Sequence, residues 1–302
     1  MNRVKNISIA HLGPSGTYAE QAAVFYVNWL TQKTGFSGTL YPCQSIAKSL
    51  KAVADGKTQL AVVPIENSIE GSVTMTMDAL WQLDSLEIQL ALVMPIAHAL
   101  ISRAASLDSI QTVYSHPQAL AQCQGWLGQF LPTVQLIPTH STTEALKGLD
   151  QDLTAASISS SRAAQLYNLP ILASNINDYT ENCTRFWVVS KSQETPEALM
   201  INSVNNLTNI LGDASHTSLA FSLPANLPGA LLKTLQVFAQ LGINLSRIES
   251  RPTKRSMGEY LFFIDLEAGI KSAQMQLALA ELAMHTEVIK IFGSYLVLPI
   301  NT

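Results

Sequence analysis

Polar residues gather in four short segments whose residue types suit chemistry on an anionic small molecule. The segments are Gly13-Pro14-Ser15-Gly16-Thr17, Glu66-Asn67-Ser68, Ser115-His116-Pro117-Gln118 and Asn182-Cys183-Thr184-Arg185-Phe186. Glycines let a backbone approach a ligand closely, and a helix N-terminus favours an anion. An arginine binds a carboxylate through two parallel hydrogen bonds. Hydroxyl, amide and carboxyl groups can hold or move a proton.

Each segment also has a purely structural interpretation, and the residues alone leave both interpretations open. Thr17 with Glu20, and Ser115 with Gln118, have the spacing of capping boxes at helix starts. Cys183 could be a thiol nucleophile, but such a cysteine is more often a small packing residue. The six histidines form no pair with metal-ligand spacing, which argues against a metal site.

Alternating strands and helices must position these segments. Strands are predicted at Ile7–Leu12, Leu60–Pro64, Thr112–Ser115, Ala155–Ile158 and Phe186–Ser190, and helices at Thr17–Leu30, Thr76–Leu83, Gln118–Phe130 and Ser161–Tyr167. This alternation is typical of βαβ units and a mainly parallel sheet. Ligands of such sheets bind beyond the carboxyl ends of the strands, where three of the four polar segments fall.

The pattern stops at a polar stretch, residues 191–216, and then restarts. The second region is predicted to contain strands at Leu219–Leu223, Ile243–Glu249, Tyr260–Leu266 and Val288–Leu298, and helices at Leu231–Ala239 and Ser272–His285. The order β-α-β-β-α-β is the ferredoxin-like arrangement. We interpret the polar stretch as a linker between two separately folded regions, so that truncation near Ser215 should leave an active first region.

Composition narrows the function classes. The chain has 302 residues, enough for two or three folded units, and a net charge of −4 that argues against nucleic-acid binding. Charged residues make up 13%, which suggests extensive buried surface, subunit contacts included. The most apolar run, Leu90–Ile101, is too short to span a membrane. With no secretory signal and three widely spaced cysteines, a reduced cytoplasmic compartment fits best.

Eight segments in order resemble the prephenate dehydratase family in its form with a C-terminal ACT domain. They are Leu12–Ala23 (LGPSGTYAEQAA), Val63–Val73 (VPIENSIEGSV), Tyr114–Cys123 (YSHPQALAQC), Ser141–Leu146 (STTEAL), Asn182–Phe186 (NCTRF), Pro228–Leu232 (PGALL), Ile243–Pro252 (INLSRIESRP) and Glu259–Asp265 (EYLFFID). The resemblance covers about residues 7–190 and 217–299. Each segment alone is weak, but the ordered set is specific.

The resemblance implies a fold and a domain organisation. The catalytic region, residues 1–190, is expected to be two α/β lobes resembling type II periplasmic binding proteins, with lobe 1 at about 1–103 plus 175–190 and lobe 2 at about 104–174. Residues 191–216 would be the linker, and residues 217–302 the ferredoxin-like α+β (βαββαβ) ACT domain. No chorismate mutase segment precedes residue 7, so the single-activity form is expected.

The resemblance also implies an activity, the decarboxylating dehydration of prephenate to phenylpyruvate in L-phenylalanine biosynthesis. Aromatisation drives this reaction, so neither a cofactor nor a metal is expected. Thr184 would act at the leaving hydroxyl, with four further polar residues around the substrate and four candidates for carboxylate anchoring. The four polar residues are Glu66, Asn67, Ser115 and Gln122, and the candidate anchors are Ser15, Thr17, Ser68 and Arg185. His140, where relatives carry a polar or acidic residue, departs from the family pattern.

In the regulatory region, the resemblance implies that L-phenylalanine binds at a dimer interface. The candidate effector residues are Gly229, Ala230, Leu231, Leu232, Asn244, Leu245, Glu249 and Ser250. A homodimer or homotetramer is therefore expected, with no nucleic-acid or membrane partner. Three alternatives stay open: arogenate dehydratase, a non-catalytic amino-acid sensor, and a solute-binding protein without chemistry. The missing signal peptide and the Thr184 segment argue against the last of these.

Overall fold

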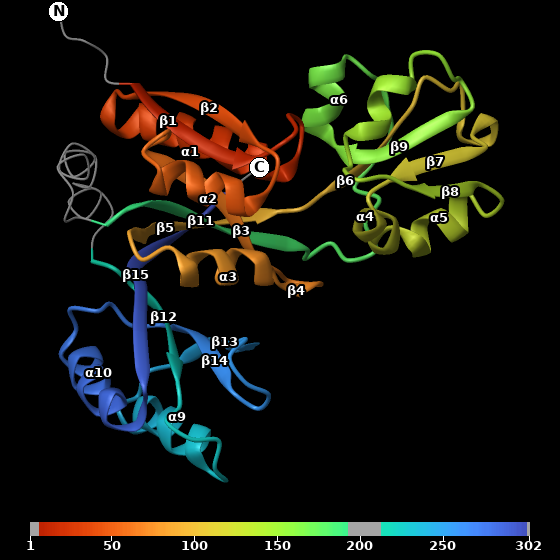
Figure 1. Ribbon diagram of the computed structural model, residues 1–302. Helices are drawn as coiled ribbons and strands as arrows, with labels where there is room; N and C mark the ends of the chain where they lie inside the picture. Colours follow the sequence, from red (N-terminus) through yellow and green to blue (C-terminus); the bar gives the residue numbers. More distant parts are fainter. Residues whose placement is uncertain (1–5, 193–212, 301–302) are drawn as a thin grey trace, which may run out of the picture.

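The computed structural model describes residues 6–192 and 213–300, and it contains two α/β lobes and a C-terminal ferredoxin-like domain (Figure 1). Of the linker expected at 191–216, residues 193–212 lie outside the described residues. The last strand before this gap ends at Lys191, and the first strand after it begins at His216.

The first lobe is built on a mixed sheet with the order β5-β11-β3-β1-β2. Its strands are β1 (Asn6–Leu12), β2 (Ser37–Cys43), β3 (Leu60–Asn67), β5 (Leu86–Pro95) and β11 (Cys183–Lys191), and its helices are α1 (Tyr18–Thr34), α2 (Ile46–Ala54) and α3 (Thr74–Gln82). The two-residue β4 (Gly71–Ser72) pairs with β3. Strands β1, β2 and β3 are parallel, as expected, but β11 runs antiparallel to both β3 and β5. The antiparallel strand is the chain returning from the second lobe.

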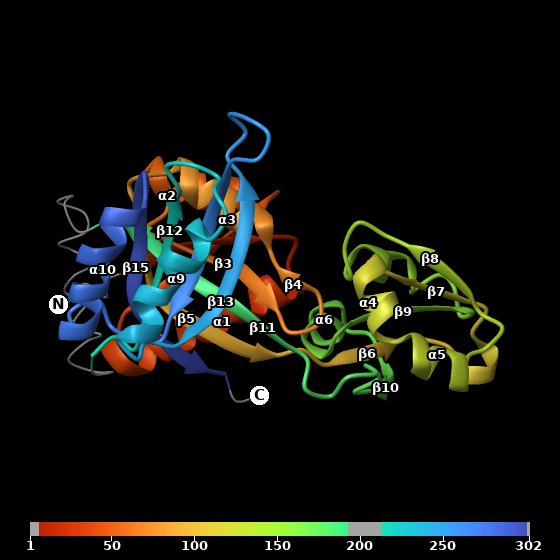
Figure 2. The ribbon, with the colours of Figure 1, turned by 90° about the horizontal axis from the view of Figure 1, so that it is seen from below.

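The second lobe has its own sheet, with the order β10-β6-β9-β7-β8. Its strands are β6 (His98–Ile101), β7 (Thr112–Ser115), β8 (Gln135–Pro138), β9 (Ala155–Ser160) and β10 (Ile171–Ser174), and its helices are α4 (Pro117–Gln122), α5 (Gln124–Phe130), α6 (Ser161–Tyr167) and the 3₁₀ turns η1 (Leu107–Ser109) and η2 (Glu144–Gly148). Figure 2 shows this lobe beside the first, joined by the chain after β5 and the chain before β11. Because β6 pairs with β9, it belongs to the second lobe. The chain therefore passes from the first lobe to the second before His98 and not near residue 103.

Side-chain caps start the helices that border the lobe junction. Thr17 caps α1 by accepting from the backbone N–H of Glu20 at 3.3 Å, as its spacing predicts. The helix after β7 differs from the expectation, because its cap is His116 and not Ser115. The His116 ring accepts from the N–H of Gln118, and Pro117 occupies the first helical position.

The C-terminal domain has the expected ferredoxin-like topology, with the sheet order β13-β14-β12-β15. Its elements are β12 (His216–Ser222), α9 (Ala230–Gln240), β13 (Leu245–Pro252), β14 (Tyr260–Leu266), α10 (Ala273–His285) and β15 (Val288–Pro299). Both helices pack on one face of the sheet, where Phe221, Phe238 and Leu282 are fully buried in a core. This arrangement confirms the fold class predicted from the βαββαβ pattern.

The sheet of the C-terminal domain continues into the sheet of the first lobe through β15. Residues Leu296–Pro299 of β15 pair in parallel with Leu90–Val93 of β5. The two regions also share one core, in which Trp187 of β11 and Phe263 of β14 are both about 1% exposed. The last strand and part of the core therefore belong to both regions. Sequence periodicity could not reveal this, because it reports only which face of an element is buried.

Candidate functional site

A network of buried polar side chains lies where the two lobes meet. Thr184 at the start of β11 is in register with Asn67 at the end of β3. The Nδ2 atom of Asn67 donates to Thr184 Oγ1 at 2.9 Å and to Asn182 Oδ1 at 2.8 Å. Asn182 Nδ2 in turn donates to Gln122 Oε1 of the second lobe at 3.0 Å. The structure thus brings together three predicted catalytic residues: Thr184, Asn67 and Gln122.

The amide orientation of Asn67 decides what Thr184 can do. The backbone N–H groups of Ile69 and Glu70 each donate to Asn67 Oδ1 at 3.1 Å. Because N–H groups only donate, Oδ1 and Nδ2 cannot exchange places. Thr184 Oγ1 therefore accepts from Asn67, and its own proton is free to be donated to a ligand.

Four members of this network were not predicted as site residues. His98 Nε2 lies 2.9 Å from Gln122 Oε1, and Tyr18 Oη lies 2.9 Å from His98 Nδ1. Gln122 Nε2 donates to Glu70 Oε1 at 3.3 Å, and Asn182 bridges Asn67 and Gln122. Tyr18, Glu70 and Asn182 stood inside the motif segments, so their position in the motifs was the available signal. His98 stood in an apolar run that sequence reasoning tested only as a membrane span.

Glu66 and Arg185 lie on the opposite face of the sheet from Thr184. The two are paired in register between β3 and β11, and their side chains are 3.6 Å apart from Arg185 Nη1 to Glu66 Oε2. Successive side chains of a strand point to opposite faces. Phe186 shares one core with α1, whereas Trp187 packs in the core shared with the C-terminal domain. Arg185 accordingly contacts Asp265 of the C-terminal domain, at 3.5 Å.

Ser115 is fully buried and its hydroxyl is committed. It donates to the backbone carbonyl of Ile158 on the neighbouring strand β9, at 2.6 Å. This bond ties β7 to β9 close to the start of α4, the helix that carries Gln122. The hydroxyl of Ser115 therefore holds two strands together near α4 and is not a member of the network.

Three of the four candidate carboxylate anchors, Ser15, Thr17 and Ser68, lie at two loops of the first lobe. Ser15 is exposed in the turn before α1. Thr17 donates to the carbonyl of Pro14 at 3.0 Å, which fixes the same turn. Ser68, also exposed, accepts from the backbone N–H of Cys183 at 3.0 Å and so holds the loop after β3 against the start of β11.

His140, the residue that departs from the family pattern, is exposed, and its backbone N–H donates to Glu144 at 2.7 Å.

The first turn of α1 also joins the two lobes directly. The carboxylate of Glu20 accepts from the N–H of Gly16 at 2.8 Å and pairs with Arg162 of the second lobe at 3.1 Å. Ser160 donates to the carbonyl of Gly16 at 2.9 Å. Burial raises the pKa of Glu20, but the hydrogen bonds from Arg162 and Gly16 outweigh it, so the pKa of this carboxyl is lowered. The predicted anion position at this helix end is thus held by the protein's own carboxylate.

The predicted effector residues lie at two places of the C-terminal domain. Gly229 caps α9 with φ +80°, a conformation that suits glycine, and Ala230–Leu232 form the first turn. Asn244 precedes β13, and Leu245, Glu249 and Ser250 lie within it. β13 is the edge strand of its sheet. Leu232 and Ile248 are 69% and 42% exposed, so apolar side chains are exposed both at this helix end and on this strand.

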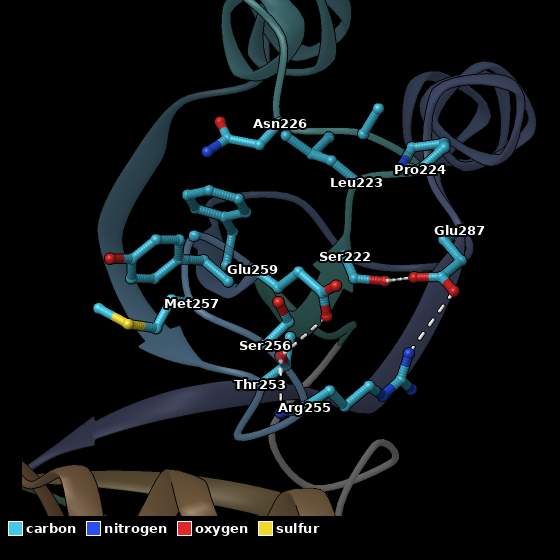
Figure 3. Close-up of a pocket in the computed structure, with 14 residues that line it drawn as sticks. Ser222, Leu223, Pro224, Asn226, Thr253, Arg255, Ser256, Met257, Glu259 and Glu287 are labelled. Atoms are coloured by element: carbon cyan, nitrogen blue, oxygen red, sulfur yellow. Dashed lines mark hydrogen bonds and ion pairs between the residues drawn. The ribbon is translucent and has the colours of Figure 1, made fainter.

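A pocket of about 480 Å³ opens in the same domain (Figure 3). It is lined by the chain that follows β12, by the loop from β13 to β14, and by Glu287. Ser222 donates to Glu287 at 3.0 Å, and Arg255 lies 3.5 Å from the same carboxylate. None of the predicted effector residues lines this pocket.

No group of three or more His, Cys, Asp or Glu residues in the described ranges, 6–192 and 213–300, could hold a metal ion. No helix in them is long and apolar enough to cross a membrane.

Comparison with known proteins gives a consistent result. A family model described as prephenate dehydratase matches residues 9–194, and one described as the ACT domain matches residues 217–283. The chain is 38% identical over 291 residues to the bifunctional chorismate mutase/prephenate dehydratase of Aquifex aeolicus, covering 96% of this chain and 74% of that protein. It is 35% identical over 292 residues to the prephenate dehydratase of Lactococcus lactis subsp. cremoris, covering 96% and 97%.

A solved structure agrees over the same length. The crystal structure of prephenate dehydratase in complex with L-Phe from Arthrobacter aurescens has a TM-score of 0.81 and 33% sequence identity. The similarity covers 96% of this chain and 90% of that chain.

Proposed function

The chain belongs to the prephenate dehydratase family, with an ACT domain at its C-terminal end, and from that premise we propose how its residues perform the reaction. The family assignment confirms the resemblance seen in the ordered motifs. The reaction converts prephenate to phenylpyruvate with loss of carbon dioxide and water. The observation that carries the mechanism is the fixed hydrogen bond from Asn67 to Thr184.

The leaving hydroxyl is the chemical difficulty. Hydroxide is a poor leaving group, so the departing oxygen needs a hydrogen bond or a proton as its bond to carbon breaks. The bond between the ring and its carboxylate breaks, and the carboxylate leaves as carbon dioxide. The electron pair of that bond aromatises the ring as the C–O bond breaks, and the expelled hydroxide takes up one proton from solvent to become water. No electrons are gained from or lost to another molecule.

Thr184 supplies the hydrogen bond in this proposal. A threonine hydroxyl is a weak acid, so it donates a hydrogen bond within a polar network instead of acting as a free acid. The N–H of Asn67 occupies one lone pair of Thr184 Oγ1, which leaves the hydroxyl proton to point toward the substrate. A donor that is oriented before the reaction stabilises the developing negative charge without reorganising.

The remaining groups bind and orient the substrate in the same proposal. Gln122 and Asn182 close the lobe junction over the ring, and both are at least 95% buried. The exposed loops of Ser15 and Ser68 carry the candidate anchors for the two carboxylates. Glu66 and Arg185 lie on the face of the sheet opposite Thr184. We therefore propose that these two residues support the strands that carry the site and do not contact the substrate.

We further propose that L-phenylalanine regulates the enzyme through the ACT domain, in a homodimer. The Arthrobacter relative was solved in complex with L-Phe. In this chain the helix end at Gly229 and the open edge strand β13 supply a surface that two copies could share around one ligand. A ligand that contacts two chains binds the assembled state better and favours assembly by that difference in affinity. The three free cysteines fit a cytoplasmic enzyme.

The decisive experiment compares kcat/KM on prephenate and on arogenate, with phenylpyruvate and phenylalanine as the respective products. We expect prephenate to be preferred. A preference for arogenate would make the chain an arogenate dehydratase, whose substrate differs by one amino group. Turnover of neither substrate, with binding of phenylalanine retained, would indicate a sensor. Sedimentation with and without phenylalanine tests the dimer, and a monomer at micromolar concentration would contradict it.

A further inference from the structure

The polar network does not end at Gln122 but continues to a buried histidine. His98 opens β6 and is 3% exposed. Its Nε2 atom lies 2.9 Å from Gln122 Oε1, and its Nδ1 atom lies 2.9 Å from the hydroxyl of Tyr18. The single hydroxyl proton of Tyr18 lies between two acceptors, His98 Nδ1 and the carbonyl of Ala97, which is 2.8 Å from Tyr18 Oη. A histidine so placed must present a particular tautomer.

Donor and acceptor roles can be assigned along the whole network, starting from Asn67, whose orientation is fixed by the backbone. Backbone N–H groups fix Asn67 with its Nδ2 toward Asn182 Oδ1. That contact turns Asn182 Nδ2 toward Gln122, which must then present Oε1. At the other side of the same amide, Gln122 Nε2 donates to the carboxylate of Glu70. Gln122 Oε1 therefore accepts from both neighbours, and His98 Nε2 must carry a proton.

The protonation of His98 agrees with this assignment. Burial lowers the pKa of His98, although the hydrogen bond with Gln122 raises it in part. With its pKa below the ordinary value, the ring is neutral at pH 7 and carries one proton. That proton is on Nε2, and Nδ1 faces the Tyr18 hydroxyl.

We propose that His98 is a positioning residue for the dehydration, which acts by donating Nε2–H to Gln122 and so fixing every amide between itself and Thr184. This inference rests on the proposed function of Thr184. His98 does not touch the substrate in this proposal. His98 matters because a side-chain amide that flips by 180° inside a closed network places two donors or two acceptors opposite each other.

The consequence of losing the donor can be followed residue by residue. If the side-chain amide of Gln122 flipped, its NH₂ group would face the NH₂ group of Asn182. The amide of Asn182 could relieve this only by flipping too, and its NH₂ group would then face that of Asn67. Asn67 cannot follow, because two backbone N–H groups hold its oxygen. The mismatch therefore reaches the atom that orients Thr184.

Two substitutions of His98 separate the roles of the two ring nitrogens. The amide of glutamine reaches the position of Nε2, so His98→Gln can keep a donor toward Gln122. The shorter amide of asparagine reaches only the position of Nδ1, so His98→Asn cannot. We expect His98→Asn to lower kcat about tenfold, equivalent to about 1.4 kcal/mol and typical of one lost hydrogen bond, with KM nearly unchanged. His98→Gln should keep kcat within about threefold, and the thermal midpoints of the two should agree.

A double-mutant cycle tests whether His98 acts through Gln122. In a Gln122→Leu background, His98→Asn should cost nothing further, because the acceptor is gone. Tyr18→Phe, which leaves Nε2–H in place, should keep kcat within about threefold and serves if His98→Asn does not fold. Equal losses in both His98 variants, full additivity in the cycle, or a tenfold loss in Tyr18→Phe would each overturn the proposal. Failure of the proposed function would look different, because the wild-type enzyme would then not turn over prephenate at all.

Discussion

Arg185, the residue directly after Thr184, reaches across to Asp265 of the ACT domain, with 3.5 Å between Nη1 and Oδ2. Asp265 is fully buried and also accepts two hydrogen bonds from Arg247, at 2.7 and 3.1 Å. Ser218 donates to the same carboxylate at 2.5 Å. A strand that carries the proposed catalytic hydroxyl on one face therefore carries, on its other face, an ion pair to the regulatory sheet.

This ion cluster predicts a specific pattern of stabilities. Asp265→Asn should destabilise the fold by about 3–5 kcal/mol, because Arg247 would be left buried without its counter-charge. Replacing this buried pair, as Arg247→Met with Asp265→Leu, should recover most of that loss, because Arg247 is removed together with its counter-charge and Arg185 keeps Glu66 at 3.6 Å. Chemical denaturation of the three proteins measures the difference. A double variant no more stable than Asp265→Asn would contradict the explanation.

Removing the hydroxyl of Thr184 should lower turnover without weakening the binding of prephenate. Thr184→Val keeps the shape of the side chain but removes the donor, and kcat should fall about 10²–10³-fold, as for other preorganised donors. Thr184→Ser keeps the hydroxyl and should retain most activity. Steady-state kinetics on prephenate check both variants. Near wild-type kcat in Thr184→Val would remove this hydroxyl from the mechanism.

Shared strand pairing and a shared core predict that the catalytic region is not stable alone. A chain ending at Ser192 loses β15 from the edge of β5 and uncovers the core around Trp187. The loss of several buried aromatic side chains should lower the thermal midpoint by roughly 10 °C or more.

A full-length protein cut by a protease site introduced between Ser192 and Asp213 is the matched control for this truncation. It keeps every strand that the structure describes and should retain the midpoint of the intact chain. An equally stable truncated protein would show that β15 contributes nothing to the first lobe.

The Glu20–Arg162 pair predicts a loss of stability in acid. The pKa of Glu20 is lowered in the folded protein, so its contribution is present above the unfolded pKa, about 4.3, and is lost as pH falls through the lower folded value. Thermal midpoints of wild type and Glu20→Gln should differ most at pH 6–7 and converge toward pH 3. Glu267→Gln, at an exposed position, is the control for loss of one charge. A gap that widened in acid would have the wrong sign.

A substitution at Gly229 should weaken inhibition by phenylalanine without changing catalysis. Its φ of +80° strains most side chains, but asparagine tolerates this conformation. Gly229→Asn should therefore fold, should require about tenfold more phenylalanine for half-inhibition, and should keep kcat without effector. Gly35→Asn, at φ +74° in the first lobe, is the matched control and should change neither value. Unaltered inhibition of Gly229→Asn would place the effector elsewhere.

Local signals predicted local structure well, and the failures lie where contacts are distant in sequence. The cap at Thr17 and the βαββαβ order could be read from residue spacing, because each depends on neighbours along the chain. The network partner Asn182 and the role of His98 could not, since both depend on which strands of two lobes meet. Arg185 illustrates the limit most clearly. Its chemistry suggested a carboxylate ligand, and the structure gives it a carboxylate from Asp265, 80 residues away.

The pairing of β15 with β5 also bears on how the protein is made. Roughly 200 residues separate the two paired segments, which at about 5–20 residues per second means roughly 10–40 s between their synthesis. During that interval the outer edge of β5 has no strand beside it, and an open edge is a template for association with other chains. Nascent molecules of this enzyme therefore share a period of exposure that ends only when the final strand arrives, and the demand for chaperones should be concentrated there.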